Sequence, residues 1–152
     1  MRFLVNKFIE WAVRGRSVTR VVTFDGRLLF YRYEPFWPDE WQGCDRPPWW
    51  RPFNILLHQW KNGEADAFHD HPRWSVSICL KGQITEKTPW KDRVLRPGSV
   101  VFRSRKNIHA FDAPAADTWT LFIVGRRNYK QNSYAITPRS PQTSGLPPEI
   151  DK

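Results

Sequence analysis

The fold is decided by Gly63-Glu-Ala-Asp-Ala-Phe-His69-Asp-His71 and by Arg96-Pro-Gly-Ser-Val-Val-Phe-Arg103, with His109 following a short distance after the second stretch. Alternate residues of an extended strand point to the same face, so His69 and His71 present both imidazoles to one side. His109 arrives from a different predicted strand. Three converging imidazoles suit a first-row transition metal and leave coordination positions open for substrate or water.

The sequence around these histidines predicts a mostly β protein. Asp25-Gly26 is a hairpin-turn dipeptide between two apolar runs, and Gly or Pro punctuates the chain from residue 53 onward. Apolar residues at near-helical spacing predict a short amphipathic helix close to the N-terminus. The predicted elements are a helix over Phe3–Val13, hairpin strands Val18–Phe24 and Leu28–Tyr33, and strands Phe53–Trp60, Trp74–Leu80, Gln83–Thr88, Ser99–Arg103, Ile108–Asp112 and Thr118–Val124.

Both stretches resemble the two signature motifs of the cupin superfamily. In the first motif, Gly63, the His-x-His pair and a closing Gly82 fall at the family positions, but Ser75 stands where the family has Glu. In the second motif Gly98 and His109 match, whereas Ser104 and Lys106 replace the Pro and Gly of the turn. The region from Phe68 to His109 also resembles small cupin-like proteins of bacteria and their phages. The resemblance implies an all-β double-stranded β-helix, a jelly-roll barrel, with the N-terminal helix and hairpin added.

The cupin resemblance implies one divalent transition metal ion on His69, His71 and His109. Iron is the metal we expect first, with Zn, Mn or Ni as alternatives. Thiol dioxygenases, a cupin branch, hold Fe(II) with three histidines and no carboxylate, so Ser75 does not argue against activity. Three neutral imidazoles leave the metal dipositive and receptive to an anionic substrate.

Other residues are candidates for the wall of this site. Arg103 could clamp a substrate carboxylate bidentately, or it could face outward. Glu86 could reach the metal or its water, or pair with a surface cation. His58 could form a buried hydrogen bond or lie at the barrel mouth. If the side chains alternate regularly after His71, the substrate-facing residues include Arg73, Ser75 and Ser77.

Composition limits the class of protein. The chain has 152 residues, which suits one domain. Its formal charge of +9 favours anionic partners, yet the basic residues are spread along the whole length, which makes nucleic acid a less favoured partner than a small anion. Two distant cysteines favour neither a disulfide scaffold nor a zinc ribbon. The first residues are too short an apolar run for a signal peptide, so we expect a cytoplasmic protein with no membrane span.

The expected layout is a single cupin domain over residues 1–136, followed by a flexible tail over 137–152. Residues 1–52 supply the helix, the hairpin and a loop rich in Pro and Trp, and residues 53–136 supply the barrel core. The leading functional hypothesis is a metal-dependent, dioxygenase-like enzyme acting on a small anionic substrate, in a chain that could form a homodimer. The alternatives are a non-catalytic metal-binding or ligand-binding cupin, or a basic interaction scaffold.

Overall fold

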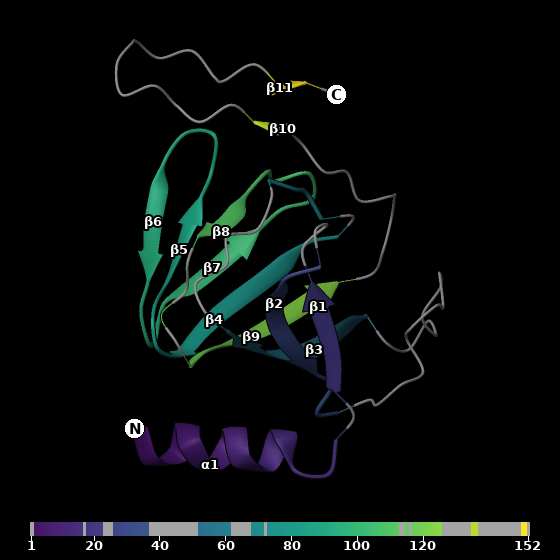
Figure 1. The fold of residues 1–152 in the computed structure, drawn as a ribbon, viewed down its shortest axis with the longest axis vertical. Helices are drawn as coiled ribbons and strands as arrows, with labels where there is room; N and C mark the ends of the chain where they lie inside the picture. The colour runs from purple at the N-terminus through teal and green to yellow at the C-terminus, as the bar shows by residue number, and fades with distance from the viewer. Residues whose placement is uncertain are drawn as a thin grey trace.

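The computed structural model describes residues 2–16, 18–22, 26–36, 52–61, 68–71, 73–112, 115, 117–125, 135–136 and 150–151. Two antiparallel sheets form the body of the molecule, and one helix lies beneath it (Figure 1). The elements are α1 (Arg2–Val13), β1 (Val18–Val22), β2 (Leu28–Tyr33), β3 (Phe53–Trp60), β4 (Ser75–Lys81), β5 (Ile84–Lys87), β6 (Asp92–Leu95), β7 (Val100–Arg103), β8 (Ala110–Asp112), β9 (Thr118–Gly125), β10 (Ala135–Ile136) and β11 (Ile150–Asp151). The predicted jelly-roll class is confirmed.

The larger sheet has six strands in the order β1-β2-β3-β9-β4-β7, and a three-stranded sheet, β6-β5-β8, faces it. β3 and β9 pair over their full lengths, from Phe53 opposite Gly125 to Trp60 opposite Thr118. This pairing joins segments far apart in the chain, as a jelly roll requires. The predicted strand Phe53–Trp60 has the bounds expected, while β6 was not predicted.

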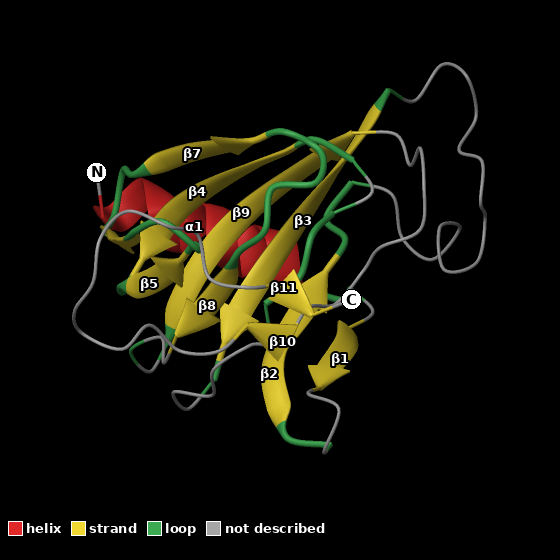
Figure 2. Ribbon diagram, turned by 90° about the horizontal axis from the view of Figure 1, so that it is seen from above, coloured by secondary structure: helices red, strands yellow, loops and turns green. Residues whose placement is uncertain are grey.

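The outer face of the larger sheet is covered by α1, which runs beneath β3, β9 and β4 (Figure 2). The alternation of β9 sends Trp119 and Leu121 to this face, where they pack with Ile9 and Ala12 of the helix and with Leu57 of β3. Leu57 and Ala12 are fully buried. The predicted amphipathic helix is therefore a structural element that seals one face of the barrel.

A second apolar cluster fills the closed end of the barrel, between the two sheets. Its buried members are Leu29, Phe30, Trp60, Cys79, Ile84, Leu95, Val101 and Phe111. Cys79 is a free thiol in this cluster. The polar residues of the barrel lie on the far side of this apolar cluster, which therefore packs beneath the histidine group.

Gly82 shows why the closing glycine of the first motif has to be glycine. Its φ is 77°, in the left-handed region, and a Cβ at this position would collide with the backbone and side chain of Thr118. Thr118 also fixes this turn directly, since its hydroxyl donates to the Ala115 carbonyl at 2.7 Å, lies 3.0 Å from the Gln83 carbonyl oxygen and accepts from the Gln83 amide at 3.1 Å. The turn between β4 and β5 is thereby held against the start of β9.

Two predicted features fall mainly outside the described residues. The loop rich in Pro and Trp occupies residues 34–52, of which only 34–36 and 52 are described. Most of the predicted tail is likewise not described, although β11, near its end, pairs antiparallel with β10, which immediately precedes the tail. The proposed domain bounds therefore stay a prediction. Across the part of the chain that is described, no helix is long and apolar enough to cross a membrane.

Candidate metal centre

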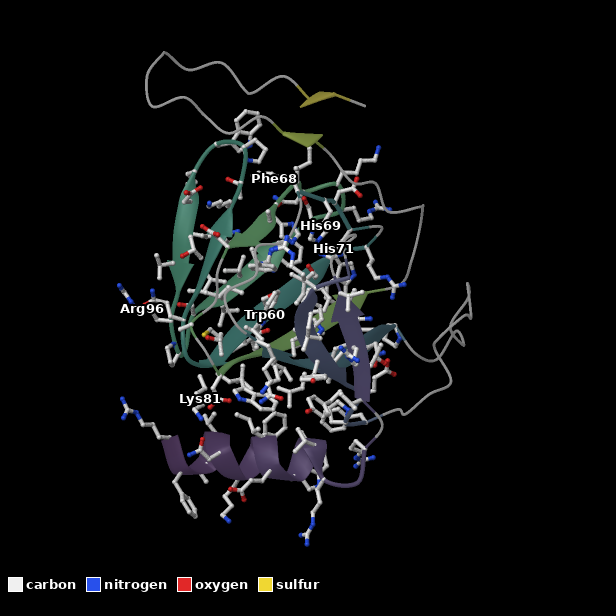
Figure 3. All side chains as sticks on the ribbon, in the orientation of Figure 1. Trp60, Phe68, His69, His71, Lys81 and Arg96 are labelled. Carbon is white, nitrogen blue, oxygen red and sulfur yellow. The ribbon has the colours of Figure 1, made fainter. Side chains whose placement is uncertain are left out.

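The three predicted metal ligands come together. His69 and His109 form an antiparallel bridge in which the His69 amide donates to the His109 carbonyl at 2.9 Å and the His109 amide donates to the His69 carbonyl at 3.0 Å. The ring centroids lie 4.7 to 5.0 Å apart, and one nitrogen from each ring falls within 4.8 Å of the other two. Figure 3 shows His69 and His71 adjacent in the barrel, beyond Trp60. This spacing suits one metal ion.

The tautomer of His109 is suited to metal binding. Its Nδ1 lies 3.1 Å from the Asn107 carbonyl oxygen, an acceptor, so Nδ1 carries the proton and donates it. The lone pair is then on Nε2, which is buried and has no hydrogen-bond partner among the described residues. A backbone carbonyl that orients a ligating imidazole in this way is typical of metal sites. The donor set therefore fits a transition metal.

The protonation state of the ring nitrogens also favours metal binding. Burial, and then the positive charge of Arg103, lowers the pKa of His109 from 6.5 to about 2. Burial beside the other two histidines lowers the pKa of His71 to about 2 as well. Both rings are consequently neutral near pH 7, and neutral imidazole is the form that ligates a metal.

A buried ion-pair cluster lies next to the histidines. Arg103 of β7 donates through Nε to Glu86 Oε1 at 2.5 Å, and Arg93 of β6 donates through Nε to Glu86 Oε2 at 2.5 Å. Glu86 and Arg103 are 0% and 1% exposed, while Arg93 is 35% exposed. Since Arg103 belongs to the larger sheet and Glu86 to the smaller one, this ion pair joins the two walls of the barrel. Two cations share one carboxylate, so the cluster carries a net positive charge.

The Arg103 side chain is held on several sides. Its Nη1 donates to the Ser77 hydroxyl at 2.7 Å, and its guanidinium lies 5.3 Å from the centre of the Phe111 ring. Phe111 in turn lies 5.4 Å from the ring of His109. The remaining nitrogen, Nη2, is buried and has no hydrogen-bond partner within the described part of the chain. Arg103 thus faces inward with one donor to spare near the histidines.

Ser75 occupies the position of the family carboxylate and faces the interior. Ser75 is fully buried at the start of β4, opposite Arg103 of β7. Its hydroxyl has no hydrogen-bond partner among the residues described. Ser77 is also buried, two residues further on, and is engaged by Arg103. The alternation predicted from His71 therefore holds along β4.

The other candidate residues of the site wall, Glu86, Arg73 and His58, lie at different places relative to the histidine group. Both oxygens of Glu86 accept from arginines, and Glu86 is not part of the histidine cluster, so its predicted contact with the metal or its water has no support in this geometry. Arg73 precedes β4 and is half-buried, and its place in the site wall stays a prediction. His58 is buried, with its ring 5.3 Å from Phe122, which lies 5.6 Å from His71.

Sequence reasoning did not single out Arg32 or Arg93. Arg32 of β2 pairs with His58 of β3 in the sheet register, and its positive charge contributes to the lowered pKa of His71. Arg32 is two residues from Phe30, whose side chain lies in the interior, so the alternation of side chains along a strand could have predicted that Arg32 also faces inward. Arg93 lies on a strand that was itself missed, so no pattern pointed to its contact with Glu86.

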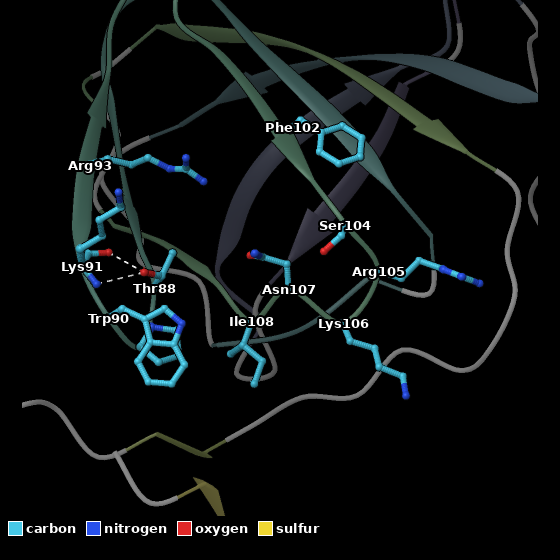
Figure 4. A pocket seen from close by; sticks show the side chains of 11 residues that line it. Thr88, Trp90, Lys91, Arg93, Phe102, Ser104, Arg105, Lys106, Asn107 and Ile108 are labelled. Carbon is cyan, nitrogen blue, oxygen red and sulfur yellow. Dashed lines mark hydrogen bonds between the residues drawn. The ribbon is translucent and has the colours of Figure 1, made fainter. Parts of the chain in front are cut away.

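A groove of about 470 Å³ lies outside the barrel, against the turn that carries His109 (Figure 4). None of the predicted site residues lines this groove. Arg93 and Asn107 belong both to the groove wall and to the contacts around the site, because Arg93 pairs with Glu86 and the Asn107 carbonyl accepts from His109. The lining residues are Thr88, Pro89, Trp90, Lys91, Arg93, Phe102, Ser104, Arg105, Lys106, Asn107 and Ile108.

Comparison with known proteins identifies solved structures that share this fold. No protein-family model and no curated protein sequence matches the chain. Among solved structures, the chain is similar to an RmlC-like cupin from Shewanella frigidimarina, with a TM-score of 0.57, 10% identity, and 75% of this chain and 86% of that chain covered. It is also similar to the polyketide cyclase RemF from Streptomyces resistomycificus, with a TM-score of 0.56, 15% identity, and 83% and 79% of the two chains covered.

The topology and these structural similarities define the class. The protein has a cupin-like fold, a double-stranded β-helix that carries three converging histidines in its interior. At 10 to 15% identity, the similarities establish the fold and not the reaction.

Proposed function

We propose that the protein is a metal-dependent enzyme that acts on a small anionic substrate. The observation that carries the proposal is the group of three histidines with ligand atoms within 4.8 Å of one another, next to the buried Arg103. Buried polar atoms are normally paired, and an unpaired one costs about 1–3 kcal/mol. The free donors on Arg103 and Ser75 therefore favour a bound polar ligand beside the metal.

The charge balance around the site supports an anionic substrate. The neutral His71 and His109 cannot offset a divalent metal, and Glu86 is already shared between Arg103 and Arg93. A substrate carboxylate would be attracted to this excess of positive charge. Arg103 Nη2 would orient the substrate by a charge-assisted hydrogen bond, and Ser75 would donate a second hydrogen bond.

The narrower proposal is an oxygen-dependent reaction at iron. Bound Fe(II) would supply the redox centre for oxygen chemistry, and the three-histidine set without a carboxylate is the reason to favour iron over Zn, Mn or Ni. Phe111, Phe122 and Trp60 would keep bulk water from the reacting groups. The neighbour named as a polyketide cyclase supports catalysis as a use of this fold.

Oxygen uptake tests the enzymatic part of the proposal. The protein is reconstituted anaerobically with Fe(II) and mixed with oxygenated buffer and a panel of anionic thiols and organic acids. We expect substrate-dependent oxygen consumption by the wild type and its loss in His71→Ala. Arg103→Lys should raise the KM more than it lowers kcat, because it weakens a hydrogen bond that binds the substrate equally in the ground state and the transition state. If no compound in the panel causes oxygen consumption, the proposed dioxygenase reaction is rejected.

A second candidate is a basic interaction scaffold, and the outer groove is the observation that favours it. The groove carries four basic residues, and two of its aromatic side chains, Trp90 and Phe102, are 63% and 65% exposed. Such a surface suits an anionic partner, and nucleic acid binding there would weaken steeply with added salt. A cytoplasmic location and a homodimer also stay predictions from the sequence.

A further inference from the structure

Two arginines flank the histidine group from opposite sides. On one side the guanidinium of Arg103 lies 5.3 Å from the Phe111 ring centre, and Phe111 contacts His109 at 5.4 Å. The other side is made by β2, β3 and β9. There Arg32 lies opposite His58 in the β2–β3 register, and the His58 ring stacks on Phe122 at 5.3 Å.

Phe122 connects this second side to the metal ligands. Its ring lies 5.6 Å from that of His71, so one aromatic ring contacts both His58 and a predicted ligand. Phe111 has the equivalent position between Arg103 and His109. An aromatic ring therefore borders the histidine group on each side. Arg32 follows on the second side through Phe30, because its guanidinium lies 5.8 Å from the centre of the Phe30 ring, which stacks on His58 at 4.4 Å.

Both arginines carry a buried N–H group that lacks a hydrogen-bond partner in the described part of the molecule. These groups are Nε of Arg32 and Nη2 of Arg103, and Nε2 of His58 lacks a partner in the same way. Each such group costs about 1–3 kcal/mol if nothing completes it. Cationic donors are completed best by anionic oxygens, which form hydrogen bonds roughly twice as strong as neutral ones.

The strand order agrees with this two-sided arrangement. Arg32 lies on β2 and Arg103 lies on β7, and β3, β9 and β4 separate these two strands in the six-stranded sheet. Burial lowers the pKa of both arginines, and one acidic group acts in the opposite direction on each, Glu34 on Arg32 and Glu86 on Arg103.

We propose that Arg32 and His58 form a second anion subsite, so that the substrate carries two acidic groups, one held by Arg103 and the other by Arg32. This inference rests on the proposed function and narrows its substrate class from a small anion to a small dianion. The metal would lie beside the part of the substrate between the two acidic groups. A dicarboxylate, or a carboxylate with a second acidic group, has the required chemistry.

Calorimetric titration of the metal-loaded protein tests the second subsite. The probes are malonate, succinate, glutarate and adipate, each compared with the monocarboxylate of the same chain length. We expect at least one dicarboxylate to bind about tenfold or more tightly than its matched monocarboxylate, since a second ion pair of about 1.4 kcal/mol gives that ratio. Arg32→Met should remove this difference by lowering dicarboxylate affinity about tenfold, with a much smaller loss of monocarboxylate affinity.

The matched control is Arg20→Met, which makes the same substitution at an exposed position on the neighbouring strand β1 and should keep the preference. If Arg32→Met does not fold by circular dichroism, Arg32→Lys replaces it and should retain a reduced preference. Equal binding of mono- and dicarboxylates, binding of neither, or a preference that survives loss of Arg32 would overturn the inference. The proposed function fails in a different way, by the absence of bound metal or of turnover.

Discussion

The two faces of the six-stranded sheet have opposite chemistry. The outer face, under α1, is a closed apolar cluster in which Trp119 and Leu57 pack against the helix. The inner face around the histidines carries Ser75, Ser77, His58 and Thr120, all of them buried. Apolar packing stabilises a barrel, whereas burying polar groups is costly, so the polar groups buried on the inner face point to a function other than stability. The difference separates the part of the sheet that stabilises the fold from the part that carries the site.

The largest expected effect is on the inner face. Glu86→Gln removes the carboxylate charge that Arg103 and Arg93 share, and breaking a buried ion pair costs about 3–5 kcal/mol. Urea denaturation measures this loss. The control is Asp112→Asn, which breaks the exposed pair between Asp112 and Lys87 and should cost about 0–1 kcal/mol. A loss below about 1 kcal/mol for Glu86→Gln would show that the inner cluster is not held as the contacts indicate.

The corresponding test on the outer face is Leu57→Ala. Leu57 is fully buried beneath α1, and such truncations cost about 2–5 kcal/mol through lost packing and the cavity left behind. Because the side chain points away from the histidines, the metal content per folded molecule should not change. Denaturation gives the stability, and elemental analysis of the folded fraction gives the metal. Loss of metal from folded Leu57→Ala would contradict the separation of the two faces.

A smaller effect is expected from pH. Burial, with Arg32 and His71 nearby, lowers the pKa of His58 well below 6.5, so the unfolded chain binds a proton in acid before the folded one does. The stability of metal-free protein should be highest above pH 6.5 and fall as the pH drops below that value, by up to about 1.4 kcal/mol per pH unit for this group. His58→Gln should make the profile less steep, with the remaining slope coming from His71 and His109, and denaturation at pH 7 and pH 5 measures the change. An unchanged slope would mean that His58 is not held neutral.

The smallest expected effect concerns the turn that carries His109. Lys106 has a φ of 63°, the left-handed conformation that the family motif satisfies with glycine. A side chain costs about 1–2 kcal/mol there, and the greater freedom of unfolded glycine offsets about 0.4–1 kcal/mol of this. Lys106→Gly should therefore raise the free energy of unfolding slightly, and thermal unfolding of metal-free protein checks it. Clear destabilisation would indicate that the Lys106 side chain has a stabilising contact.

The sequence predicted best the strand bounds and side-chain directions that depend on a local pattern of residues. The bounds of Phe53–Trp60 followed from the Gly and Pro residues that punctuate the chain, and the inward side of Ser75 and Ser77 followed from alternation along one strand. The approach of His69 to His109 depends on strand pairing, and only the family resemblance indicated it. The strand Asp92–Leu95 was missed because four residues with two charges give no clear period.

The contacts between the two sheets could not be predicted from local pattern. Glu86 and Arg103 lie on different sheets, so no spacing in the chain shows that they meet or that Arg93 completes the cluster. The sequence therefore left the orientation of both side chains open. Arg32 was overlooked for a related reason, because its importance comes from its place beside β3 and not from any motif.

The most direct test of the account is the metal content of untagged protein, measured by elemental mass spectrometry. The wild type should hold close to one transition-metal ion per chain, and His69→Ala and His109→Ala should hold almost none. His58→Ala, which removes the buried histidine outside the ligand group, should retain the metal. A wild type that carries no metal and takes up neither Fe, Mn, Ni nor Zn would contradict the central claim that the three histidines form a metal centre.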